Sequence, residues 1–330
     1  MIKSTVFLLL KHFLTVKKKP VGYAILTYHD IVKIDDLRFP DPMIIDYDSF
    51  VSQISFLSKE FIILPIDKIV ERIKNQVKPD KLYIGITFDD GFLSQFELAA
   101  PFLNKMSIPA TFFITTDFAD QKVIPAIEKW KLWIKNSNKT ISFKYKNINN
   151  QYDLNKHSSK IIFFSDILKL LKPGEYSDNQ LHCYIKDLFN NRETAQLYMN
   201  WDNIIKLNNN SLFTIGGHSV THSNLLKIDD PLNNEIISSK KIISDNLSNS
   251  CKYFAYPFGI NNTVNSKIFS LLHNSGYKAG FTSFSGLNNK PNSIYEINRI
   301  APLGGENLDK LLIRIFWAKE INTYRKFITK

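Results

Sequence analysis

The sequence has few cysteines and no long apolar run. Cys183 and Cys251 are the two cysteines among 330 residues, so a disulfide framework is excluded, and their spacing forms no C-x-x-C zinc motif. This usage is typical of proteins in a reducing compartment. The first apolar run, residues 6–10, is too short for a secretory signal, and no stretch approaches the ~20 apolar residues of a membrane span. We therefore expect a cytoplasmic protein without a signal peptide or a transmembrane helix.

Negative charge is in the minority, with 31 acidic against 42 basic residues and a formal net charge of +11. Such a balance favours anionic partners, but no RNP, zinc-finger or helix-turn-helix signature supports nucleic-acid binding. Basic residues mix with apolar ones in residues 1–20 and 306–330. Both ends could contact an anionic membrane peripherally, at the inner membrane face; the simpler interpretation is packing helices with solvated lysines.

Short apolar runs alternate with helical patterns along the chain. The runs are apolar on both faces, which is typical of parallel strands covered by helices. Strands that alternate with helices predict an α/β fold with a parallel sheet or barrel. The expected strands are residues 23–28, 61–64, 82–88, 110–115, 212–215, 253–256 and 280–282.

Residues 117–201 interrupt this alternation. The segment is too long for a plain loop, so we expect an inserted helical lobe within a single domain that spans residues 1–330. Trp201 closes the segment and could stack on the flat face of a substrate, although a core tryptophan is the slightly favoured interpretation.

Polar residues follow three of the expected strands. Residues 82–88 lead into Asp89-Asp90-Gly91, the strand near residue 215 leads into His218-Ser219-Val220-Thr221-His222, and the first strand leads into His29. In parallel α/β barrels the active site forms at the carboxyl ends of the strands. Taken singly, Asp89 could be a helix cap and His29 a core histidine. Their placement at three strand ends predicts one shared site instead.

The histidine pair at positions i and i+4 suits one metal ion, because both rings face one direction on a helical turn. Two histidines and one carboxylate leave coordination positions for water and a substrate oxygen. Zinc is the default ion, and cobalt, nickel or manganese are alternatives. Two adjacent aspartates would divide the work, one as ligand and the other as general base.

Three motifs resemble those of a known family. Thr87-Phe88-Asp89-Asp90-Gly91, His218-Ser219-Val220-Thr221-His222 and Phe254-Ala255-Tyr256-Pro257-Phe258-Gly259 look like the first three motifs of the polysaccharide deacetylases, the NodB homology domain or carbohydrate esterase family 4. The resemblance spans about residues 21–301. It implies a distorted (β/α) barrel of about seven strands. It also implies a metal-dependent hydrolase that removes N-acetyl, sometimes O-acetyl, groups from an acetylated carbohydrate of the cell envelope or its precursor.

The resemblance also implies roles for single residues. Asp89 would be the general base, and the metal ligands would be Asp90, His218 and His222. The third motif, with Tyr256 and the backbone N–H near Phe258, would bind the oxyanion. Tyr28-His29-Asp30 resembles a permuted final motif of the biofilm poly-N-acetylglucosamine deacetylases, which implies that His29 would be the general acid. His273 is the competing candidate.

One position departs from the family pattern. Many members carry an arginine in the third motif that orients the catalytic aspartate, and this chain has Ala255 there. Arg299 could supply the guanidinium from elsewhere, or it could be a surface residue. A catalytically inactive glycan-binding module is therefore an alternative function. A glycosyltransferase that binds a metal through the aspartate pair is another, but it gives His218 and His222 no role.

Overall fold

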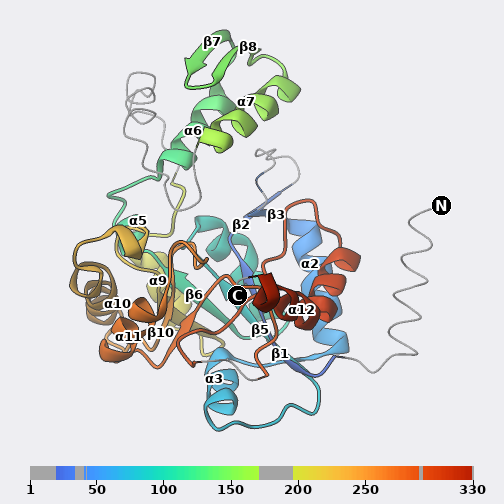
Figure 1. Cartoon of the computed structure of the whole chain (residues 1–330), viewed down its shortest axis with the longest axis vertical. Helices are drawn as coiled ribbons and strands as arrows, with labels where there is room; N and C mark the ends of the chain where they lie inside the picture. The colour runs from blue at the N-terminus through green and yellow to red at the C-terminus, as the bar shows by residue number, and fades with distance from the viewer. Residues whose placement is uncertain (1–19, 34–40, 42, 171–195, 290–292, 329–330) are drawn as a thin grey trace, which may run out of the picture.

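All seven expected strands lie in one curled parallel sheet (Figure 1). The computed structural model describes residues 20–33, 41, 43–170, 196–289 and 293–328, with side chains through residue 318. The strand order is β1-β5-β6-β9-β10-β11, and β4 also pairs with β5. The bounds are β1 (Gly22–Tyr28), β4 (Ile62–Ile63), β5 (Leu82–Phe88), β6 (Ala110–Ile114), β9 (Phe213–Gly217), β10 (Tyr253–Ala255) and β11 (Ala279–Phe281). The predicted α/β fold is confirmed.

Residues 297–300 connect the two edges of this sheet. Ile297 forms a parallel bridge with Phe281 of β11, and Ile300 forms one with Leu26 of β1. The N–H of Thr27 donates to the carbonyl of Ile300 at 3.1 Å. The segment therefore fills the gap between the edge strands, which gives the distorted barrel that the family resemblance implied.

Both faces of the strands are buried. Along β1, Ala24 and Leu26 belong to the main core cluster, whereas Tyr23 and Ile25 belong to a second cluster on the opposite face. This explains why the strand sequences lack polar alternation. Helices pack around the sheet (Figure 1); they are α2 (Tyr47–Glu60), α3 (Ile66–Lys74), α4 (Ala100–Lys105), α9 (Trp201–Asn208), α10 (Ser238–Leu247), α11 (Ser266–Asn274) and α12 (Leu308–Ile328).

Several short elements were not expected. Strands β2 (Asp30–Val32) and β3 (Ile44–Asp46) form a separate parallel pair. A π-helix precedes two of the helices: η1 (Gln95–Ala99) runs into α4, and η3 (Leu232–Ile237) runs into α10. The remaining short pieces are α5 (Thr116–Ala119) and the 3₁₀ turn η2 (Leu225–Lys227). A π-helix carries one extra residue in its turn and is frequent at functional sites.

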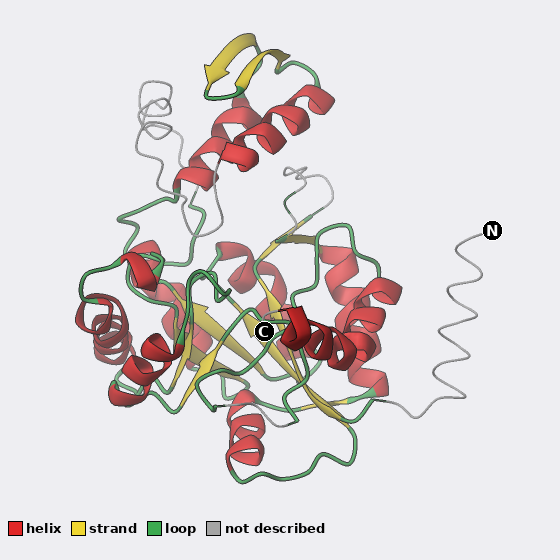
Figure 2. Cartoon of the chain, viewed as in Figure 1, coloured by secondary structure: helices red, strands yellow, loops and turns green. Residues whose placement is uncertain are grey.

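The inserted segment holds a β-hairpin as well as helices. Strands β7 (Thr140–Tyr145) and β8 (Ile148–Asp153) pair antiparallel between α6 (Ala126–Asn136) and α7 (His157–Leu170), and Figure 2 shows the hairpin in yellow at the top of the molecule. Residues of all four elements form a core separate from that of the barrel. Residues 171–195 of the expected insertion lie outside the described part.

Among the described residues, no helix is long and apolar enough to cross a membrane. Helix α12 buries Leu311 and Ile315 against the main core, while Ile313 and Trp317 are exposed. The expected basic N-terminal segment lies outside the described residues, as does Cys183, and Cys251 is a buried free thiol. Peripheral membrane contact stays a prediction.

Candidate metal and catalytic site

The Asp-Asp-Gly turn starts where β5 ends. The N–H of Asp89 donates to the carbonyl of Tyr28 at 3.0 Å, which continues the pairing with β1 by one residue. Asp90 then has φ 73° and Gly91 φ 81°, a left-handed conformation that glycine adopts freely and aspartate tolerates. The chain turns sharply here, so the adjacent carboxylates face different partners: Asp89 pairs with Arg299, whereas Asp90 faces two histidines.

The histidine motif is a loop and not the helical turn that we expected. It follows β9, with the N–H of His218 donating to the carbonyl of Ile114 at 2.8 Å. Ser219 and His222 have φ 68° and 59°, and the N–H of His222 donates to Oγ of Ser219 at 3.0 Å. The i, i+4 spacing still brings the two rings together, with centroids 4.9 Å apart. The local turn does this instead of helical periodicity.

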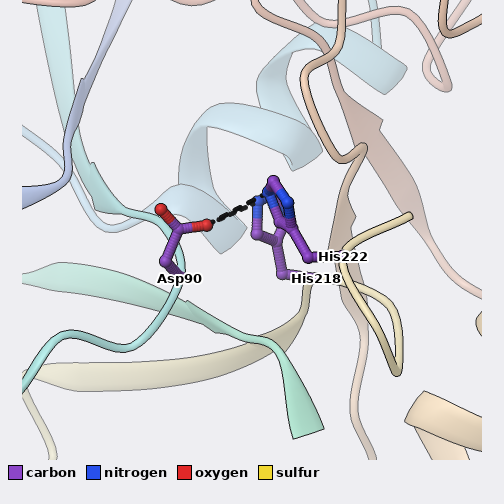
Figure 3. A group of neighbouring side chains, drawn as sticks. All are labelled: Asp90, His218 and His222. Atoms are coloured by element: carbon purple, nitrogen blue, oxygen red, sulfur yellow. Dashed lines mark ion pairs between the residues drawn. The ribbon is translucent and has the colours of Figure 1, made fainter. Parts of the chain in front are cut away.

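Asp90, His218 and His222 converge on one point (Figure 3). Nε2 of His218 lies 3.3 Å, and Nε2 of His222 3.2 Å, from Oδ1 of Asp90. All three candidate ligand atoms lie within 4.8 Å of one another.

The donor set fits a divalent metal. Nδ1 of His218 lies 2.8 Å from the carbonyl of Ala255, which can only accept, so Nδ1 carries the proton in a neutral ring and Nε2 presents a lone pair. That lone pair faces Oδ1 of Asp90, a buried atom without a hydrogen-bond partner among the described residues. Electron-rich atoms converge in this way where a cation lies between them, and a carbonyl that fixes the tautomer is typical of metal-binding histidines.

The same charges perturb the protonation of the metal-free site. Burial raises the pKa of Asp90, but His222 and His218 lower it more, and the pKa ends well below its usual range. Burial lowers the pKa of His218, but Asp89 and Asp90 raise it more, so the net pKa is raised. A metal ion that binds through Nε2 of His218 therefore competes with a proton there.

Arg299 holds Asp89 from the closing segment of the barrel. Nη1 and Nη2 donate to Oδ1 and Oδ2 of Asp89, both at 2.7 Å, and Nε donates to the carbonyl of Thr282 at 2.9 Å. Arg299 is 1% exposed, so it is not a surface arginine. Burial raises the pKa of Asp89, but Arg299 and His218 lower it more, so the pKa lies below its usual value. Asp89 is ionised at neutral pH.

His29 lies beside this pair. Its Nε2 is 3.9 Å from Oδ2 of Asp89, and its side chain is 15% exposed. Burial lowers the pKa of His29, and the two aspartates offset this only in part. His273, the competing general acid, lies on α11 with its ring near that of Tyr295, and its Nδ1 bonds with Oδ1 of Asn274. Of the two candidates, His29 is the one beside Asp89.

The third motif begins in β10 and continues the chain beyond its end. The hydroxyl of Tyr256 donates to the carbonyl of Tyr295 at 2.9 Å, and its N–H donates to the carbonyl of Phe281 at 3.0 Å. Both donors of Tyr256 are thus used within the protein, and its contact with the oxyanion stays a prediction. Phe258 adopts φ 60°, and its ring lies 4.8 Å from the ring of His222.

Trp201 begins α9 and is half-buried against the main core. Its indole N–H donates to Oδ1 of Asp120 at 2.6 Å. These contacts are those of a packing tryptophan, and stacking on a sugar stays a prediction.

Two polar residues that the sequence did not single out support the site loops. Gln95 is fully buried on η1, and its Nε2 donates to the carbonyls of His29 at 3.0 Å and Asp89 at 2.6 Å. Glu235 is buried on η3 and accepts from the loop between the two histidines. The sequence places Gln95 and Glu235 in helical patterns that follow the two motifs. It does not indicate which face of each helix turns to the site.

Comparisons with known proteins show the family and the fold. A family model described as polysaccharide deacetylase matches residues 76–280, more than half of the chain. Similar solved structures include the deacetylase PplD of Streptococcus pyogenes in complex with acetate, with a TM-score of 0.59 and 18% identity over 90% of this chain and 99% of that one. IcaB from Ammonifex degensii has a TM-score of 0.54 and 15% identity over 86% of this chain and 92% of that one. The deacetylase domain of BpsB from Bordetella bronchiseptica has a TM-score of 0.53 and 16% identity over 87% and 98%. A search of curated protein sequences finds no match.

Proposed function

Since this chain belongs to the polysaccharide deacetylase family, we propose that it hydrolyses acetyl groups, foremost N-acetyl, on a sugar of a cell-envelope polysaccharide or its precursor. The observation that carries the proposal is the meeting of Asp90, His218 and His222 within 4.8 Å, next to an Asp89 that Arg299 holds ionised. PplD and the BpsB domain are described as deacetylases, which supports this reaction class.

A divalent metal would be held by Oδ1 of Asp90 and the Nε2 atoms of His218 and His222. When bound, it supplies a Lewis acid that activates water and polarises the acetyl carbonyl. Zinc suits this nitrogen and oxygen donor set, and cobalt, nickel or manganese could use the same ligands.

Asp89 accepts the proton of the attacking water in this proposal. Its carboxylate is ionised at neutral pH and fixed at both oxygens by Arg299, so no conformational search precedes the transfer. His29 donates a proton to the amine nitrogen as the C–N bond breaks, leaving acetate and a free amino sugar. Burial lowers the pKa of His29. We therefore infer that the His29 ring is protonated mainly when negative charge develops on the reacting acetyl group beside it. The backbone at Phe258 would stabilise that charge.

The pair of Arg299 with Asp89 weakens the main reason for an inactive glycan-binding module. The absent arginine of the third motif would mark lost chemistry if nothing replaced it, but Arg299 makes a bidentate pair with Asp89. This ion pair would keep Asp89 in the charged state that a proton acceptor needs, which favours the hydrolase over the glycan-binding module. The glycosyltransferase alternative leaves the two histidines without a function.

Acetate release from a panel of acetylated oligosaccharides tests the proposal, together with metal analysis of the same preparation. We expect one divalent ion per chain, loss of activity with a chelator, and recovery with zinc or cobalt. Asp89→Asn is the matched control, because it keeps the shape of the site and the three metal ligands. Stoichiometric metal without acetate release from any member of the panel would favour the glycan-binding module. Absence of a bound metal would reject the proposal.

A further inference from the structure

Glu235 binds the backbone between the two histidines. Its Oε2 accepts from the N–H of Val220 at 2.9 Å and of Thr221 at 3.0 Å, and its Oε1 accepts from Oγ1 of Thr221 at 2.7 Å. Glu235 is 3% exposed. A buried carboxylate with three short donors is a strong local restraint, and all three donors belong to residues 220 and 221.

The loop that Glu235 holds has an unfavourable backbone. Ser219 and His222 both adopt left-handed φ values, 68° and 59°, which non-glycine residues adopt at an energetic cost. Such a conformation persists when the surrounding contacts over-determine it. The loop is therefore the part of the candidate metal site that most needs outside support.

Hydrogen-bond donors support the loop on one side, and an acceptor supports it on the other. On one side, the N–H groups of Thr116 and Asp117 donate to the carbonyls of Ser219 and Val220 at 3.2 and 3.0 Å. On the other side, Glu235 accepts the amides of Val220 and Thr221. Helix α5 thus fixes the carbonyls of the loop, and Glu235 fixes its amides.

The position of Glu235 depends on the irregular start of its helix. Glu235 lies in η3, which runs directly into α10. The wider turn of a π-helix shifts the faces of the residues that follow it. η3 thereby presents a charged side chain to the loop while Ile236 remains buried in the main core.

We propose that Glu235 is a positioning residue for the metal, one that holds His218 and His222 at the spacing that a single ion requires. The proposal rests on the proposed function, since it takes Asp90, His218 and His222 as the ligands. Without Glu235, the amides of Val220 and Thr221 lose their acceptor, and the loop that carries His222 keeps the contacts of α5 with its carbonyls but loses the restraint on its amides. Partners that orient metal ligands typically contribute about 10–100-fold in metal affinity.

The test compares Glu235→Ala with Glu306→Ala in the full-length protein. Glu306 is a matched control, because it is 8% exposed and also accepts a backbone amide, that of Leu303 at 2.9 Å. Its other partner is Arg314 at 2.8 Å, on α12, and none of its contacts involves the histidine loop. The readouts are the zinc dissociation constant by chelator competition, the cobalt absorption spectrum, and the melting temperature of the metal-free protein.

We expect Glu235→Ala to weaken zinc binding by about 10–100-fold and to change the cobalt spectrum. Glu306→Ala should lower the melting temperature while leaving both metal readouts as in the wild type. Excess zinc should restore the turnover of Glu235→Ala, since the base and the acid are untouched. Equal zinc affinity in Glu235→Ala and the wild type would overturn the proposal.

Glu235→Met covers the case in which the alanine variant does not fold, because methionine fills a similar volume and offers no strong acceptor to the amides of Val220 and Thr221. We expect it to weaken zinc binding by about 10–100-fold. Wild-type affinity in a folded Glu235→Met would show that Glu235 serves folding alone and would reject the proposal. Failure of the wild type itself to bind zinc or cobalt would reject the proposed function instead, so the two failures are distinguishable.

Discussion

Replacing Arg299 by methionine should turn Asp89 into an isolated buried acid. The fully buried guanidinium of Arg299 donates one hydrogen bond to each carboxylate oxygen of Asp89, both at 2.7 Å. Methionine keeps an unbranched stem of similar length, so the variant removes the charge with little change in packing. Removing one partner of a buried ion pair costs about 3–5 kcal/mol, because the other charge remains without compensation. We expect that loss in the free energy of unfolding at neutral pH.

The pH dependence gives the sign of the effect. In the wild type the folded pKa of Asp89 is lowered, so its contribution to stability is present above the unfolded pKa of about 3.9 and is lost as the pH falls through the folded value. In Arg299→Met the guanidinium that stabilised the ionised carboxylate is gone, while burial still favours the neutral acid. The pKa of Asp89 in the folded state therefore rises above its value in the unfolded state. Asp89 then destabilises the protein at neutral pH. This penalty shrinks as the pH falls and Asp89 becomes protonated.

Urea denaturation at about pH 7 and about pH 5 measures both effects, with acetate release and metal analysis on the same samples. The stability difference between wild type and Arg299→Met should be smaller at the lower pH. Turnover should fall by about 10²–10⁴-fold, the usual contribution of general acid–base catalysis. Metal content should be unchanged, since Arg299 bonds with Asp89 and with threonines and has no hydrogen bond with Asp90, His218 or His222.

The double variant Arg299→Met with Asp89→Asn separates the two roles of the pair. It removes the uncompensated charge, so it should regain much of the lost stability. Its turnover should be no lower than that of either single variant, because residues that act as a unit are not additive. Wild-type turnover in Arg299→Met, or a double variant as unstable as Arg299→Met, would refute this account of Asp89.

Three further predictions concern the other residues of the site. Asp89→Asn should retain one metal ion per chain and lose about 10²–10⁴-fold in turnover; loss of the metal in this variant would make Asp89 a ligand instead of the base. His29→Ala should lose amide hydrolysis but keep hydrolysis of an activated aryl acetate, whose phenolate leaves without a proton, and equal losses on both substrates would argue against His29 as the acid. The pKa of His218 is raised in the metal-free site, so protons compete with zinc for this ligand. Zinc affinity should therefore fall by up to about tenfold per pH unit as the pH drops below that pKa. Equilibrium dialysis from about pH 8 to about pH 5 measures the affinity, and an affinity that does not change with pH would contradict the prediction.

The sheet and the convergence of the motifs could be predicted because each rests on a local pattern. Strands such as β5 are apolar on both faces, and their first polar residues mark the carboxyl ends that meet at one rim. Asp90, His218 and His222 come together for that reason, although 128 positions separate Asp90 from His218. The hairpin of β7 and β8 was missed because its strands face a small separate core and carry polar residues such as Asn149 and Asn150.

The conformations inside the site could not be predicted, because side-chain contacts between distant segments decide them. Ser219 and His222 are left-handed although neither is a glycine. The turn therefore has no sign in the sequence, and the motif resembled a helical turn. Gln95 and Glu235 lie in ordinary helical patterns, and their direction depends on the π-helical turns η1 and η3. Tyr256 belongs to a motif that resembles the family pattern, yet its hydroxyl bonds with a neighbouring loop.

The barrel topology explains how an arginine so far along the chain can serve Asp89. Residues 297–300 lie next to β1, and β1 pairs with β5 along its whole length. A side chain from the closing segment therefore has one strand to cross, and Nη1 of Arg299 contacts Oγ1 of Thr27 on β1 at 3.0 Å before it reaches Asp89. The separation of 210 positions along the sequence thus becomes a distance of two strands. A guanidinium from any segment that borders β1 at this level could pair with Asp89, so the alanine at position 255 removes one source of such a pair while Arg299 still provides it.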